Sequence, residues 1–152
     1  MTGNAVSAKA NIEVKKLEHC NQISPAQKSA MVVPLCNVIG KANGNEQEPL
    51  QYILSHPELL NREIADWAIN LAQAYFDGIP YMEGQEWYQY NNSSYNLACV
   101  AYLIARELKY YSIGVRSMEL QIKLAEIAGA NKLTLMMMKM DLNKLRKMSG
   151  SK

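Results

Sequence analysis

Apolar side chains recur at three- and four-residue steps over much of this chain, which is the spacing of one face of an α-helix. One such face predicts a core helix that ends near Asp77 and Gly78: Leu60, Ile64, Trp67, Ala68, Leu71 and Tyr75. A second face predicts a helix capped by Asn92 or Ser93 and closed before Gly114: Leu97, Val100, Ala101, Ile104 and Leu108. No segment alternates apolar and polar residues for more than a few positions, so the pattern predicts an all-α fold.

The C-terminal region, after an expected helix cap at Ser117, carries an apolar seam with nearly heptad spacing. The seam consists of Leu120, Leu124, Ile127, Asn131, Leu135, Met138, Leu142 and Leu145. Either one long helix or two helices joined at Gly129 could carry it, because glycine inside a helix costs about 1 kcal/mol relative to alanine. In a self-associating pair, Asn131 in the middle of the seam could set the register.

The N-terminal half contains several local start and stop signals. Residues 1–22 show no sustained period and are expected to form a loose arm, or a marginal helix at residues 12–17. Ser24 followed by Pro25 and Gln27 predicts a helix start with a capping box, whereas Pro34 is expected to break or kink that helix. Residues 40–45 read as a loop, residues 49–54 as a short helix, and Ser55 or His56 as the next cap.

Residues 78–92 contain two glycines, a proline and paired asparagines without a clean period, which predicts a long loop with at most one helical turn at residues 85–90. A chain of 152 residues with 49% apolar and 20% charged residues is near the usual size and composition of one domain. We therefore expect a single-domain bundle of about five to six helices over residues 23–150, with this aromatic-rich loop between two core helices and the arm of residues 1–22 preceding it.

Two short segments, residues 67–75 and residues 95–102, resemble the first helix of a tetratricopeptide repeat, in which small residues let two helices approach closely. Their two Asn-Leu-Ala triplets lie 26 residues apart instead of about 34, and neither segment is followed by a second helix with its terminal proline. We interpret both segments as closely packed helices that use alanine at crossings and do not assign the family.

The cysteine pattern and the hydropathy of the chain suggest the cellular compartment in which the protein lies. The three cysteines, Cys20, Cys36 and Cys99, show no CxxC pair and no metal-ligand spacing, a pattern that fits reduced thiols. The N-terminus has no apolar stretch of signal-peptide length, and no apolar run approaches the roughly 20 residues that span a bilayer. The expectation is a cytoplasmic protein without a membrane partner.

Aromatic residues are concentrated between residues 75 and 95, where seven of the chain's twelve aromatic rings lie among Gln, Asn and Ser. Rigid amphipathic rings mixed with adaptable polar groups are typical of binding surfaces. We predict partner-binding roles for Tyr81, Trp87, Tyr88 and Tyr90. The alternative is that the rings fold inward and cover the helix ends.

The C-terminal helix or helices carry more apolar residues than one face can hold, since Leu133, Met137 and Met140 lie opposite the seam. Either this helix is central in the bundle or one face awaits a partner. Because methionine repacks easily, we predict partner binding through a group on this helix. The group comprises Leu135, Met137, Met138, Met140, Leu142 and Leu145.

The distribution of charge suggests an alternative partner, a nucleic acid. Residues 132–152 contain six cations and one acid, a net +5 that leaves −3 for residues 1–131. The cations Lys139, Lys144, Arg146 and Lys147 could contact nucleic-acid phosphates, although cations near a helix C-terminus also complement its dipole.

The sequence offers few candidates for catalytic residues. His19 and Cys20 are adjacent and point apart, whereas a Cys–His pair would need folding to bring His56 to Cys36 or Cys99. Glu83 and Glu86 could present two carboxylates on one side of a helix. Metalloprotease, phosphate-loop and dinucleotide motifs are absent from the sequence.

The combined patterns predict a non-catalytic helical interaction module with no cofactor or metal, an adaptor, chaperone-like or assembly subunit. It would bind a protein partner or a second copy of itself through the C-terminal Leu/Met helix and the 78–95 segment. Nucleic-acid binding is the alternative function.

Overall fold

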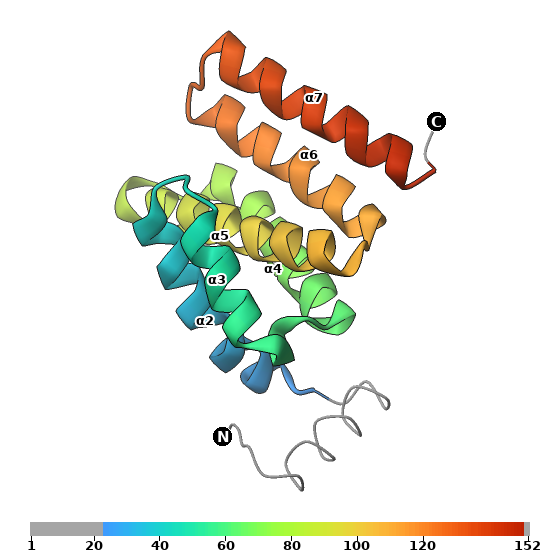
Figure 1. Cartoon of the computed structure of the whole chain (residues 1–152). Coiled ribbons are helices and arrows are strands. Elements are labelled where there is room, and N and C mark those ends of the chain that lie inside the picture. Colours follow the sequence, from blue (N-terminus) through green and yellow to red (C-terminus); the bar gives the residue numbers. More distant parts are fainter. Residues whose placement is uncertain (1–22, 151–152) are drawn as a thin grey trace, which may run out of the picture.

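The computed structural model describes residues 23–150, which form six α-helices and two short 3₁₀ helices and contain no strand (Figure 1). The helices are α2 (Pro25–Ala42), α3 (Gln47–Ser55), η1 (Pro57–Leu59), α4 (Arg62–Gly78), η2 (Ile79–Tyr81), α5 (Gly84–Leu108), α6 (Tyr111–Ile127) and α7 (Lys132–Met148). This confirms the prediction of an all-α single-domain bundle. The expected arm of residues 1–22, with its marginal helix, lies outside the described residues.

The centre of the bundle is the pair α4 and α5, with α2 and α3 covering one side. Helix α6 packs on α5 and α4, and α7 lies on the outer side of α6, at the edge of the molecule (Figure 1). The main core contains Leu35, Ile53, Leu59, Ile64, Ile69 and Ile104, each at most 1% exposed. A separate small core, with Met118, Ile122, Leu142 and Leu145 at its centre, lies between α6 and α7.

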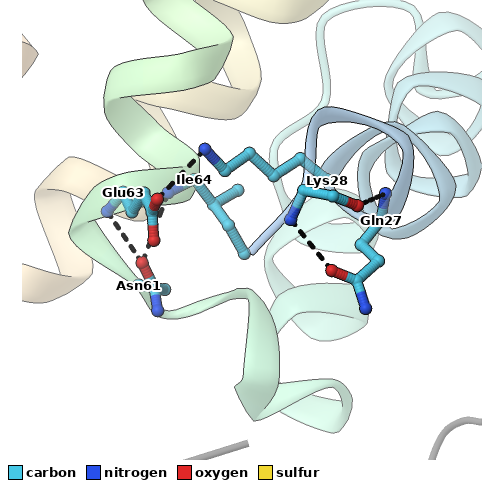
Figure 2. Close-up of polar contacts among 6 residues, drawn as sticks. Gln27, Lys28, Asn61, Glu63 and Ile64 are labelled. Atoms are coloured by element: carbon cyan, nitrogen blue, oxygen red, sulfur yellow. Dashed lines mark hydrogen bonds and ion pairs between the residues drawn. The ribbon is translucent and has the colours of Figure 1, made fainter. Parts of the chain in front are cut away.

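The starts of α2 and α4 lie side by side and are held by local polar contacts (Figure 2). Ser24 and Gln27 form the expected capping box, with the Gln27 amide donating to Ser24 Oγ at 3.1 Å. His56 is the N-cap residue of the 3₁₀ helix η1 but makes no side-chain cap. The core helix α4 is capped instead by Asn61, whose Oδ1 accepts from the Glu63 backbone amide at 2.7 Å. Lys28 forms a partly buried ion pair with Glu63 at 3.2 Å, which joins the two helices.

The expected break at Pro34 is wrong, because α2 continues through it to Ala42. Pro34 cannot donate to the carbonyl of Ala30, but both residues are exposed, so water can satisfy that carbonyl. Val32 and Leu35 on the other side of the helix are buried and hold it against the core.

The loop expected at residues 78–92 is wrong for most of its length. Helix α5 begins at Gly84, which has a φ of +58°, and continues for 25 residues to Leu108. Neither Asn92 nor Ser93 is therefore a cap. The helix ends at Lys109 in a left-handed conformation, and Gly114 lies inside α6. Packing of this segment on α4 outweighs the weak helix propensity of its asparagines and serines.

The C-terminal seam is not continuous, since two helices joined near Gly129 carry it. Helix α6 ends at Ile127, Gly129 has a φ of +78°, and α7 runs back alongside α6 (Figure 1). Asn131 is the N-cap of α7 and accepts from the Thr134 amide at 2.8 Å, so the idea that it sets a register is wrong. The expected cap at Ser117 is also wrong, because Ser117 is buried within α6.

Candidate interaction surface on the C-terminal helix

The inner face of α7 is occupied by its own chain. Leu142 and Leu145 are 6% and 8% exposed, and they pack with Met118 and Ile122 of α6. The prediction that Leu142 and Leu145 bind a partner is therefore corrected, since burial against α6 leaves them no surface to offer. Leu135 and Met138 are half-buried at the border of the same contact.

The outer face of α7 exposes a cluster of large apolar side chains. We call Leu133, Met136, Met137 and Met140 the outer-face cluster; they are 61%, 54%, 58% and 55% exposed, respectively. Their spacing of three, four and seven residues places them on one side of the helix. Met148, 62% exposed, lies two turns beyond Met140. Both predicted residues of this face, Met137 and Met140, are at the surface.

Two members of this cluster, Leu133 and Met136, were missing from the predicted partner-binding residues. The signal that could have added them is the spacing itself, because Leu133 and Met136 complete the pattern i, i+3, i+4, i+7 with Met137 and Met140.

An open hollow of about 360 Å³ runs beside the outer-face cluster. It is lined by Lys132, Leu135, Met136, Lys139, Met140 and Asn143. The lining combines three apolar side chains with two lysines and an asparagine, so the hollow suits an occupant with both an apolar and an anionic part.

The cations predicted to bind nucleic acid have different surroundings. Arg146 donates to Glu119 Oε2 of α6 at 2.9 Å, so its charge is used within the α6–α7 hairpin. Lys139, Lys144 and Lys147 are exposed and form no ion pair among residues 23–150. Pairing of Arg146 with Glu119 therefore reduces the net positive charge that these four residues would offer to a phosphate backbone.

The predicted aromatic residues divide into two groups. Tyr81 and Tyr88 are 82% and 64% exposed, as expected for a binding surface. Trp87 and Tyr90 are half-buried, and the Tyr90 ring meets the edge of Tyr75 with centroids 5.1 Å apart. Tyr90 thus follows the alternative interpretation, in which rings cover the end of a neighbouring helix.

The catalytic candidates are not assembled into one site. His56 stacks on Tyr52 with ring centroids 3.9 Å apart, and its Nδ1 lies 2.8 Å from the Tyr52 carbonyl, so this nitrogen donates. Glu83 and Glu86 are both exposed at the start of α5. Among residues 23–150, no group of three or more His, Cys, Asp or Glu could hold a metal ion.

A small cavity, which sequence reasoning missed, lies where the α2–α3 turn meets α5 and α6. It measures about 80 Å³, and its lining includes Glu46, Tyr95, Cys99 and Gln121. Burial raises the pKa of the Cys99 thiol to about 12, the hydrogen bond with Tyr95 opposing this, and burial raises the pKa of Cys36 to about 11. Both thiols are therefore protonated at neutral pH and are poor nucleophiles.

Comparisons with protein-family models, curated proteins and solved structures found no match. Within residues 23–150, none of the helices is both long and apolar enough to cross a membrane. Any proposal about function therefore rests on the surface of the molecule itself.

Proposed function

We propose that this chain is a non-catalytic helical interaction module, an adaptor, chaperone-like or assembly subunit, that binds a protein through the outer face of α7. The observation that carries the proposal is the exposure of the outer-face cluster, in which all four side chains are more than half exposed. Single exposed apolar residues are ordinary on protein surfaces, whereas a contiguous cluster is typical of an interaction site.

Burying the outer-face cluster in an interface would contribute a large free energy for a surface of this size. Full burial of one leucine or methionine side chain stabilises a contact by roughly 1.5 to 3 kcal/mol relative to exposure. Helix α7 has already used its inner face to pack on α6, and none of the other helices of residues 23–150 covers the outer-face cluster, so we expect this gain to come from a separate molecule. Three of the four cluster residues are methionines, whose flexible thioethers adapt to differently shaped partners.

Tyr81 and Tyr88 form a secondary candidate surface. Both rings are largely exposed, on η2 and on the first turns of α5. Tyrosine contributes a large contact area with little loss of side-chain entropy, together with a hydroxyl that can hydrogen-bond across an interface.

The test replaces Met136 and Met140 together by glutamine, which is a good helix former of similar length. Affinity purification of the full chain should recover protein partners that the Met136→Gln/Met140→Gln variant loses, and light scattering should reveal any self-association that the same variant abolishes. Circular dichroism and thermal unfolding should be unchanged, because neither side chain is buried.

The matched control is Leu54→Gln, which removes an apolar side chain that is 49% exposed on α3, away from α7. This control should retain every partner. Recovery of the same partners with the α7 variant, combined with an unchanged oligomeric state, would contradict the proposal.

A further inference from the structure

We infer that the partner of α7 is an acidic amphipathic helix, which lays its apolar side on the outer-face cluster and directs carboxylates at Lys132 and Lys139. This inference rests on the proposed function, because it assigns a chemistry to the protein that docks there.

The first argument is the arrangement of charge around the hollow. Lys132 and Lys139 are seven residues apart, which is two helical turns, so both lie on the same flank of the cluster. No acidic residue lines the hollow, and the first turn of α7 contains none. Asp141 lies about 200° round the helix from Lys139 and so faces the other flank. One side of the apolar cluster is thus bordered by cations without compensating acids.

The second argument is that the helix dipole does not explain these two lysines. Arg146 and Lys147 lie in the last turn of α7, where a cation is stabilised by the dipole. Lys132 lies in the first turn, where a cation is destabilised, and Lys139 lies mid-helix. Neither Lys132 nor Lys139 forms an ion pair among the described residues. Their charges are better matched by anions that come from outside the described residues.

The third argument disfavours an antiparallel pair of two copies. An antiparallel pair that superimposes the two outer-face clusters places the same flank of both copies side by side. Lys139 of one copy would then approach Lys132 of the other, with no carboxylate between them. Because like charges across an interface disfavour association, the outer face is better suited to an acidic helix than to an antiparallel second copy.

The shape and composition of the surface favour a helix over a bilayer or nucleic acid. A 17-residue helix is about 25 Å long, and the hollow beside it can receive a side chain of a partner helix. Amphipathic helices that lie in membranes carry Trp, Phe or Leu on the apolar face, whereas this cluster holds three methionines and a single leucine. A nucleic-acid backbone offers no apolar surface to cover the cluster.

The experiment uses a displayed library of 18-residue amphipathic helices with a fixed leucine seam and flanking positions randomised over Glu, Gln and Lys. Selection against the immobilised full chain should enrich Glu over Lys at the flanks by roughly tenfold or more. Selection against Lys132→Glu/Lys139→Glu should reverse the preference toward Lys. Lys123→Glu, which changes an exposed lysine of α6, should leave the preference for Glu unchanged.

The other outcomes separate this inference from the proposed function. Peptides enriched without any flank preference would overturn the acidic partner and leave protein docking intact. No enrichment, with a dimer in light scattering that Met136→Gln/Met140→Gln abolishes, would identify a second copy instead. No enrichment from a monomeric chain would overturn both ideas. So would binding of phosphatidylserine vesicles, or of mixed DNA and RNA, in place of the peptides.

Discussion

Gly114 of α6 lies against Leu145 of α7, and a Cβ added to Gly114 would be 3.4 Å from Leu145 Cδ2. Gly114 is buried, and Leu145 is 8% exposed in the small core between the two helices. The contact at residue 114 therefore has room for a methyl group but not for a larger side chain. It belongs to the packing of α7 on α6, which turns Leu142 and Leu145 inward and leaves the outer-face cluster outside.

Substitutions of two sizes at Gly114 test how much room there is between α6 and α7. Gly114→Ala should be neutral or stabilise by up to about 1 kcal/mol, because 3.4 Å is an ordinary distance and alanine favours the helix. Gly114→Leu should destabilise by about 1–3 kcal/mol through overpacking. Thermal unfolding measures the change in stability of each variant. In Gly114→Leu, faster hydrogen exchange confined to α7 would show that the loss arises at the α6–α7 contact. Equal stability of the two variants would show that the helices do not approach as described.

Gly78 and Tyr90 offer a second steric prediction, at the junction of α4 and α5. A Cβ on Gly78 would lie 2.7 Å from Tyr90 Cε2, so Gly78→Ala must displace the ring. We expect a loss of about 1–2 kcal/mol of unfolding free energy, accompanied by a change in near-ultraviolet circular dichroism.

The control for this prediction is a double-mutant cycle with Tyr90→Leu. A shorter side chain at residue 90 should remove most of the penalty of Gly78→Ala, giving a coupling energy of at least about 0.5 kcal/mol. Strictly additive effects would argue that Tyr90 does not cover Gly78.

A buried hydrogen bond between α4 and α5 gives a third prediction. Ser94 is 0% exposed, and its hydroxyl donates to the Ala72 carbonyl at 2.8 Å. Ser94→Ala should destabilise by about 1 kcal/mol, and Ser94→Val by more, because two methyl groups replace one hydroxyl in a packed contact. Ser93→Ala, at a half-buried neighbouring position, should change stability by less than about 0.5 kcal/mol. Chemical denaturation of the three variants provides the measurement.

Elements with strong local signals were predicted well from the sequence. The start of α2 at Ser24 depends on a capping box, whose partners are three residues apart. The existence of α4 and its end near Gly78 were also predicted from spacing within one helix. Its face was predicted in part: Ile64 and Ala68 are buried, whereas the buried Ala65, Ile69 and Ala72 were not predicted.

The first turns of α5 could not be predicted in this way. Gly84, Asn91 and Asn92 are local signals of a loop, yet the segment is helical because it packs on α4, with Tyr90 over Gly78. The effect of Pro34 could not be predicted from the local sequence either, because the free-energy cost of a proline inside a helix depends on whether its side of the helix is exposed. Local propensity is a weak prior that long-range contacts override.

The candidate site was predicted only in part. The sequence shows that α7 has two apolar faces, but periodicity does not say which one turns inward. That choice depends on Gly114 and Met118 of α6, which lie more than 20 residues away from α7's inner leucines. Consequently Leu142 and Leu145 were assigned to a partner, although they pack on their own chain.

The two described thiols give a prediction of reactivity. Burial raises the pKa of Cys36 to about 11 and that of Cys99 to about 12, so almost no thiolate exists at pH 8. In a Cys20→Ser variant, which removes the third thiol, alkylation by iodoacetamide should be at least tenfold slower in the native protein than in denaturant. Rapid native labelling of either cysteine, identified by mass spectrometry, would contradict the raised pKa of that thiol.

The same shifts predict how stability depends on pH. The folded protein holds both thiol protons more tightly than the unfolded chain, in which a thiol pKa is near its ordinary value of 9.0. Their contribution to stability is therefore complete below about pH 8 and is lost as the pH rises through 9 toward 11 and 12. Denaturation between pH 8 and 11 should show a fall in unfolding free energy that is smaller, by up to about 5 kcal/mol, in Cys36→Ala/Cys99→Ala, because each unit of pKa difference between the folded and unfolded thiols corresponds to about 1.4 kcal/mol. If both proteins lose stability in parallel, other titrating groups such as the tyrosines must account for the fall.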